Sequence, residues 1–243
     1  MASEGSVGGA GGVEALYPFL YEGQADLDAV LKEVTESTAA KAKEIVAVRE
    51  QVLERYADEL MACAEQMATR FAAGGRLFAC GNGGSSTDAQ ELATTFLQAA
   101  RGGRPLPALS LTNDISVVTA LSNDIDYDVV FARQIAAFGR RDDIAVCMST
   151  SGNSANLVAA FEEANRRGLL TVGLAGYEGG TMAELDTIDY LFVVSSASVH
   201  RIQEAQTTIY HALWELTQRA FEMSSQEDQR PPLVGPNERG RSG

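Results

Sequence analysis

Two short segments of the chain hold residue types that can bind an anion. They are Gly81–Ser86, with the sequence GNGGSS, and Ser149–Ser154, with the sequence STSGNS. Glycine lets a backbone curl tightly enough for several N–H groups to converge, and hydroxyl side chains supply further donors. The second segment carries four hydroxyls within six residues. That density suits the oxygens of a phosphate group, so we expect the two loops to bind a phosphorylated ligand.

The elements around these loops alternate between strand and helix. Apolar runs predict strands at 76–80, 106–111, 143–149, 170–175 and 190–194, with helices at 86–99, 115–121, 128–138, 153–167, 181–185 and 199–223. Apolar strands that alternate with helices indicate an α/β protein with a parallel sheet covered on both faces. Both loops would then open helices at the carboxyl ends of strands. Ligands bind at that edge of open α/β sheets, and the N-terminus of a helix attracts an anion.

Each loop also has an ordinary structural explanation. Turns need glycine whatever their function, and the Ser154 hydroxyl could simply cap the following helix. Two such loops in one sheet, each opening a helix, favour the binding interpretation. Neither loop fits the P-loop pattern or the dinucleotide-binding glycine pattern with its ribose-binding acid. The sequence therefore favours a phosphorylated sugar over a nucleotide.

Helical periodicity also precedes the predicted sheet. Apolar residues at helical spacing predict two long helices, at about 24–52 and 52–73, and Gly74 and Gly75 end the second. This is more helix than a small α/β core needs, so we expect the helical pair to form an oligomer interface. We assign 1–22 to a flexible tail, 23–223 to a single domain and 224–243 to a disordered tail.

Composition limits the range of partners. With 19 basic and 33 acidic side chains, the formal net charge is −14. A surface this acidic repels a phosphate backbone, so we expect no direct nucleic-acid binding. Cys63, Cys80 and Cys147 share no metal-ligand spacing, and the last two, at the ends of apolar runs, are predicted to be buried. Because the sequence shows neither an export signal nor a membrane span, we expect a cytoplasmic protein with no membrane partner.

Four segments, in this order along the chain, resemble the sugar-isomerase (SIS) domain family. They are CGNGGSSTDAQ, ALSNDIDYDVVFARQ, STSGNSANLVAAFEEA and RIQEAQTTIYHAL. Within that family the chain resembles the sedoheptulose 7-phosphate (phosphoheptose) isomerases, over about residues 30–222. The resemblance implies a three-layer α/β sandwich with a five-stranded parallel sheet, and a homotetramer with active sites at subunit interfaces. It also implies that a ketose phosphate and an aldose phosphate are interconverted through an enediol.

The resemblance further implies roles for individual residues. The phosphate site would consist of Ser149, Thr150, Ser151 and Ser154. The sugar would contact Asn82, Gly83, Gly84, Ser85, Asn123, Asp124 and Gln203.

The helix after the first loop departs from the family pattern. The isomerases carry a His there and, four residues later, a Glu that acts as the base. Both can bind zinc together with a Gln and a His of the last helix. Here Glu91 and Thr95 occupy the first pair of positions, whereas Gln203 and His211 retain the second. Thr95 cannot be a base, so we expect Glu91 and His211 to be catalytic, and Glu91, Gln203 and His211 to be candidate zinc ligands.

Other interpretations remain open for these residues. A lone His in an apolar helix such as IYHALWEL is more often a core residue, and an isolated Glu is often only solvated. His200, at the start of the last helix, is a candidate secondary contact. In lacking the Glu that acts as the base, the chain also resembles the DiaA-type branch of the family, which binds a replication initiator protein and does not catalyse a reaction. A sugar-phosphate sensor is a third alternative. Because Glu91 lies one turn from Thr95 and His211 is retained, the sequence favours the isomerase.

Overall fold

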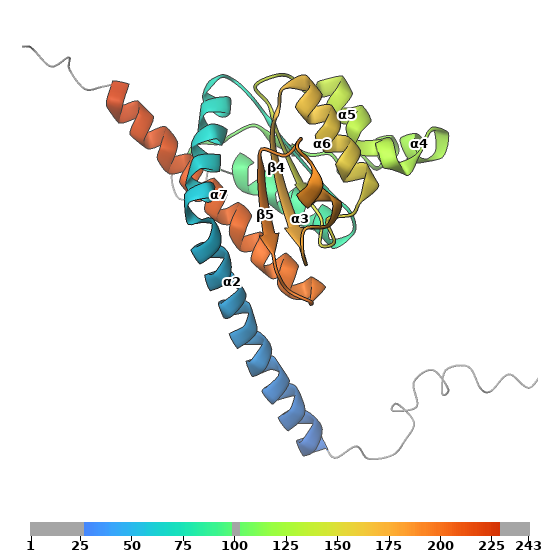
Figure 1. Ribbon diagram of the computed structural model, residues 1–243, viewed down its shortest axis with the longest axis vertical. Helices are drawn as coiled ribbons and strands as arrows, with labels where there is room; N and C mark the ends of the chain where they lie inside the picture. The colour runs from blue at the N-terminus through green and yellow to red at the C-terminus, as the bar shows by residue number, and fades with distance from the viewer. Residues whose placement is uncertain (1–26, 99–102, 229–243) are drawn as a thin grey trace, which may run out of the picture. The chain divides into compact units, whose positions relative to one another are not determined.

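Five parallel strands form the centre of the structure, a computed structural model that describes residues 27–98 and 103–228 (Figure 1). The strands are β1 (Leu77–Gly81), β2 (Ala108–Ser110), β3 (Ile144–Met148), β4 (Leu170–Gly176) and β5 (Tyr190–Val194). Their order in the sheet is β2-β1-β3-β4-β5, and every pair is parallel. The predicted five-stranded parallel sheet is confirmed.

The chain reaches each following strand through a helix. The helices are α3 (Gly84–Leu97), α4 (Ile115–Asp124), α5 (Val130–Phe138), α6 (Ala155–Arg167) and α7 (Val199–Asp228), with 3₁₀ turns η3 (Tyr127–Val129) and η4 (Gly180–Glu184). None of the described helices is long and apolar enough to cross a membrane.

The strands β1, β3 and β4 bury both of their faces. Alternate residues of a strand point to opposite faces. Thus Leu77 and Ala79 of β1 pack with side chains of α2, α3 and α7, whereas Phe78 and Cys80 pack with those of α5 and α6. Figure 1 shows α5 and α6 on one side of the sheet and α7 on the other. The result is the expected three-layer sandwich.

The predicted pair of N-terminal helices is wrong. Residues 27–72 form one continuous helix, α2 (Leu27–Ala72). The physical reason is that the segment contains no proline or glycine, so nothing ends the first helix near Val52. Gly74, with φ of +87°, lies just beyond the helix, as the sequence predicts.

The chain divides into two units at Ile45, and the sheet belongs to the second unit. In the first unit, the described side chains of 28–44 are exposed apart from the half-buried Ser37. The predicted tail at 1–22 lies outside the described residues. Helix α7 continues past residue 223 to Asp228, because the segment SSQED contains no helix breaker. The rest of the predicted C-terminal tail is not described.

Candidate active site

The two Ser/Gly-rich loops lie side by side at the carboxyl edge of the sheet. Strands β1 and β3 are neighbours, and Gly81 at the end of β1 pairs with Met148 at the end of β3. Each loop leads directly into a helix, α3 after the first and α6 after the second. Strand order reverses between β1 and β3, which is where open α/β sheets bind ligands. The predicted placement of both loops is confirmed.

Three hydroxyls of the second loop converge. The Ser149 Oγ lies 3.3 Å from the Ser154 Oγ and 3.5 Å from the Ser151 Oγ. The backbone N–H of Gly152 donates to Ser149 Oγ, and that of Asn153 donates to Ser151 Oγ. We name this loop, Ser149–Ser154, the anion clamp.

The geometry of the clamp depends on one glycine. Gly152 has φ of +70°, which favours glycine, and a Cβ there would lie 1.9 Å from the carbonyl oxygen of Gly179. Ser154 occupies the N-cap position of α6, but its side chain makes no capping hydrogen bond. Its hydroxyl is directed to Ser149 instead. This observation favours binding over the simple capping explanation.

The first loop is tied to the second by a pair of amides. Asn82 and Asn156 exchange two hydrogen bonds of 2.9 Å, and the Tyr127 hydroxyl donates to Asn82 Oδ1 at 2.8 Å. The backbone N–H of Ser85 donates to Asn82 O, and the Ser85 side chain is buried. Gly83 has φ of +54° and is exposed, so its backbone is open to a ligand.

Helices α3 and α7 meet in a contact that we call the seam. A Cβ at Gly84 would lie 2.3 Å from Gln203 Nε2, so the Gln203 amide lies against the start of α3. Further along both helices, Glu91 Oε1 lies 3.7 Å from His211 Nε2. Residue numbers increase on both helices from the first contact, Gly84 with Gln203, to the second, Glu91 with His211. The two helices therefore run parallel. Glu91 is exposed and His211 is half-buried, which leaves their pair open to a substrate.

Asp88 also belongs to the seam, because Gly84, Asp88, Glu91 and Thr95 lie three or four residues apart on one face of α3. Its Oδ2 is buried and has no hydrogen-bond partner among the described residues. Burial, with a smaller contribution from Glu91, raises the pKa of Asp88 to about 6. Across the seam, burial also raises the pKa of Tyr210, with Glu91 and Asp88 adding to the effect. The seam thus contains a carboxyl group that can carry a proton near neutral pH.

The remaining predicted ligand residues lie apart from this arrangement. Asn123 donates to Asp124 at 2.8 Å, and both are exposed at the end of α4. Tyr127, shortly after them, makes the contact with Asn82 of the first loop. His200 is exposed in the first turn of α7.

The candidate zinc ligands do not converge. Glu91 and His211 approach each other, but Gln203 lies against Gly84. Gln203 and His211 are eight residues apart, which is about 12 Å along a helix. Within 27–98 and 103–228, no three His, Cys, Asp or Glu side chains are grouped so that they could hold a metal ion. The residues present therefore fit zinc poorly, since zinc takes at least three protein ligands.

Several residues of this site were missed by the sequence reasoning. Asn156 and Tyr127 hold Asn82, and Gln206 of α7 donates to the Ser149 carbonyl oxygen. No sequence pattern reveals these contacts, because each joins elements distant in the chain. The sequence does place Asp88 on the same helix face as Glu91, which could have indicated a site residue. An acid near the N-terminus of a helix can equally serve only to stabilise that helix.

Comparison with known proteins agrees with this geometry. Residues 42–176 match the SIS domain. A phosphoheptose isomerase from Roseiflexus sp. is 42% identical over 175 residues, which cover 72% of this chain and 88% of that protein. A phosphoheptose isomerase from Desulfovibrio desulfuricans is 45% identical over 179 residues, covering 73% and 84% of the two chains.

Solved structures give the same result. The phosphoheptose isomerase GmhA from Neisseria gonorrhoeae has a TM-score of 0.69 at 35% identity, with 76% of this chain and 99% of that chain covered. A phosphoheptose isomerase from Francisella tularensis has a TM-score of 0.66 at 30% identity, covering 75% and 98%. The chain therefore belongs to the SIS-domain family, in the group of the phosphoheptose isomerases.

Proposed function

We propose that this protein is a ketose–aldose isomerase acting on sedoheptulose 7-phosphate or a related sugar phosphate. The observation that carries the proposal is the presence of two complementary groups of residues, one in the loop that follows β3 and one on the helix that follows β1. The anion clamp offers converging hydroxyls and backbone N–H groups, and the neighbouring seam offers an exposed carboxylate beside an imidazole. The names of the similar proteins favour catalysis over the binding-only alternatives.

The phosphate group would anchor the substrate far from the reacting carbons. Hydroxyls of Ser149, Ser151 and Ser154 would donate to its oxygens, with the dipole of α6 adding a favourable field. Anchoring at the phosphate supplies binding energy that orients the other end of the sugar. Asn82 and the exposed backbone of Gly83 would contact the sugar hydroxyls.

Proton transfer would take place at the seam. Glu91 removes the proton from the hydroxyl-bearing carbon beside the carbonyl, and the electron pair of that C–H bond forms the C=C bond of the enediol. A neighbouring acid gives a proton to the former carbonyl oxygen, and Asp88, with its raised pKa of about 6, is suited to this role. Return of a proton to the former carbonyl carbon and loss of the other hydroxyl proton complete the exchange. His211 holds the Glu91 carboxylate in place.

No step of this mechanism is assigned to zinc, because Gln203 lies away from the Glu91–His211 pair. Zinc would act as a Lewis acid at the carbonyl oxygen if it were bound. In this chain the seam residues themselves carry the proton transfers.

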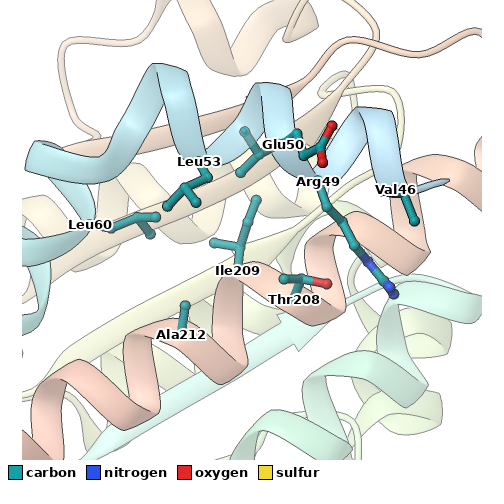
Figure 2. A pocket seen from close by; sticks show the side chains of 9 residues that line it. Val46, Arg49, Glu50, Leu53, Leu60, Thr208, Ile209 and Ala212 are labelled. Carbon is teal, nitrogen blue, oxygen red and sulfur yellow. The ribbon is translucent and has the colours of Figure 1, made fainter. Parts of the chain in front are cut away.

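We also propose the homotetramer, with active sites at subunit interfaces. The helix α2 leaves Val46, Leu53 and Met61 about half exposed or more. Between α2 and α7 lies a cavity of about 280 Å³, and Figure 2 shows Leu53, Leu60 and Ile209 facing it. Exposed apolar surface of this kind supports association. Light scattering should give about four times the chain mass of 25.8 kDa, and the mass of one chain would contradict the tetramer.

Incubation with sedoheptulose 7-phosphate, followed by NMR, tests the function. The wild-type protein should form the aldose phosphate, whereas Glu91→Gln should lower kcat by about 10² to 10⁴-fold, as expected for loss of a general base. The amide keeps the size of the side chain and cannot accept the proton. Thr94→Ala, on the exposed side of the same helix, serves as the control and should leave kcat unchanged. Equal activity of Glu91→Gln and the wild type would remove Glu91 from the mechanism.

A further inference from the structure

One fully buried amide connects α7 to the anion clamp. The side chain of Gln206 has no exposed surface, and its Nε2 donates to the backbone carbonyl oxygen of Ser149 at 3.3 Å. Ser149 is the residue whose hydroxyl lies within 3.5 Å of the hydroxyls of Ser151 and Ser154. Gln206 thus holds the backbone of the central residue of the clamp.

The other end of the amide is unsatisfied. Gln206 Oε1 is buried and has no hydrogen-bond partner among the described residues. A methionine of similar length would fill the same space without the unpaired Oε1, whose burial is destabilising, but it could not donate a hydrogen bond to the Ser149 carbonyl oxygen. An amide here is therefore poorly explained by packing alone.

The surroundings of the clamp make its position depend on α7. A Cβ at Gly176, the last residue of β4, would lie 2.4 Å from the Thr150 carbonyl oxygen and 2.6 Å from Ile202 side-chain atoms. Three parts of the chain therefore lie close together here: the Thr150 backbone of the clamp, Gly176 at the end of β4 and the Ile202 side chain of α7. Along α7, Ile202 and Gln206 are four residues apart and share one face. On this face Gln206 donates to the Ser149 carbonyl oxygen, and Ile202 lies beside Gly176, at the end of β4 next to the Thr150 backbone.

We propose that Gln206 is a positioning residue for phosphate binding, which fixes the Ser149 backbone so that the clamp hydroxyls converge on the anion. The proposal rests on the proposed function, in which the clamp holds the phosphate. Gln206 does not touch the substrate. Its amide determines where the Ser149 hydroxyl lies relative to those of Ser151 and Ser154.

The test compares Gln206→Met with the wild-type enzyme. Methionine keeps the volume and removes the donor to Ser149. We expect the KM for sedoheptulose 7-phosphate and the inhibition constant of inorganic phosphate to rise together by about three- to tenfold, as for loss of one neutral hydrogen bond. The value of kcat should change less than KM. Gln206→Leu, which also lacks the donor to Ser149, should raise both constants by a similar factor, and it provides a second variant if Gln206→Met does not fold.

Gln134→Met is the matched control. Gln134 is also a buried glutamine whose Nε2 donates to backbone carbonyl oxygens, those of Leu111 and Val130, but it lies on α5. This variant should lower the Tm without changing KM or the inhibition constant. If Gln206→Met likewise lowers only the Tm, Gln206 is merely structural and the proposal is wrong.

A separate measurement distinguishes this failure from failure of the proposed function. Inorganic phosphate should raise the Tm of the wild-type protein, and raise it less in Gln206→Met. If phosphate raises the Tm of the wild-type protein but no turnover is seen, the proposed isomerase activity is contradicted. The role of Gln206 in phosphate binding is still tested by the size of the Tm shift in Gln206→Met. Turnover by the wild type with identical KM and phosphate inhibition in Gln206→Met would contradict the inference alone.

Discussion

At the scale of the residue, Asp88 shows how burial changes the chemistry of an ordinary side chain. Its Oδ2 has no hydrogen-bond partner among the described residues, and Glu91 lies one turn further along α3. Desolvation disfavours the ionised carboxylate, and the neighbouring negative charge adds to this effect. With a pKa of about 6, Asp88 can exchange a proton near neutral pH.

The same shift makes stability depend on pH. The pKa of Asp88 is higher in the folded state, about 6, than its ordinary value of 3.8. The folded state then binds more protons between those values, so this group lowers stability as pH rises from about 4 to 6. Asp88→Asn removes the ionisation. We expect its Tm to exceed that of the wild type at pH 7 to 8, and thermal unfolding should show this advantage shrinking toward pH 4.

An advantage of Asp88→Asn that is equal at pH 4 and pH 8 would contradict this origin of the shift. Asp124→Asn, at an exposed position, is the control and should show no such trend. The activity of Asp88→Asn should fall as well, because the amide cannot give a proton to the carbonyl oxygen.

At the scale of the element, the site depends on the close approach of helices and loops to strand ends. Gly176 ends β4 where the clamp backbone and α7 meet, and any side chain there would overlap the Thr150 carbonyl oxygen. Backbone cannot move aside as a flexible side chain can. Glycine is therefore required by the packing of three elements.

Gly176→Ala should consequently displace the clamp. We expect a loss of about 1 to 3 kcal/mol in the free energy of unfolding, the usual range for overpacking, and a higher KM for the sugar phosphate. Denaturant titration and steady-state kinetics measure the two effects.

Gly74→Ala provides the comparison. Gly74 has open space around it and φ of +87°, so its substitution should be destabilising through backbone strain while leaving KM unchanged. A Gly176→Ala protein with wild-type stability and KM would contradict the packing argument.

The positions of the strands and of the two Ser/Gly-rich loops could be predicted from the sequence, because both depend on local residue patterns. Apolar runs placed β5 at its observed limits and β1, β3 and β4 within one residue at each end. The predicted burial of Cys80 and Cys147 is confirmed, and their Sγ atoms lie 3.1 Å apart across β1 and β3. Residues such as Gln206 could not be found, because their role arises from contacts over 57 positions of the chain.

Helix limits were predicted less well for a related reason. The spacing of apolar residues indicates which face of a helix is buried. It does not show whether two adjacent helical segments form one continuous helix. The division expected near Val52 was wrong because only a breaker or a cap ends a helix, and α2 contains neither there. The zinc prediction depended on Gln203 joining Glu91, whereas the parallel packing of α3 and α7 places Gln203 at the other end of the seam.

At the scale of the whole molecule, a strongly acidic protein must bind an anionic substrate. With a formal net charge of −14, the overall field opposes the approach of a sugar phosphate. Binding must therefore come from local donors, the clamp hydroxyls and the backbone N–H groups at the starts of α3 and α6. The carboxyl groups proposed to be catalytic lie on the seam, so in the proposed mechanism phosphate anchoring and proton transfer occupy separate parts of the site.

The most direct test is the conversion of sedoheptulose 7-phosphate in D₂O, followed by NMR. A proton removed by a carboxylate and returned through an enediol exchanges with solvent in part, so the wild-type protein should form the aldose phosphate with deuterium at the carbon that receives the proton. Glu91→Gln should slow both conversion and deuterium incorporation by about 10² to 10⁴-fold while inorganic phosphate still raises its Tm. Absence of conversion by the wild-type protein, or unchanged deuterium incorporation by Glu91→Gln, would contradict the account.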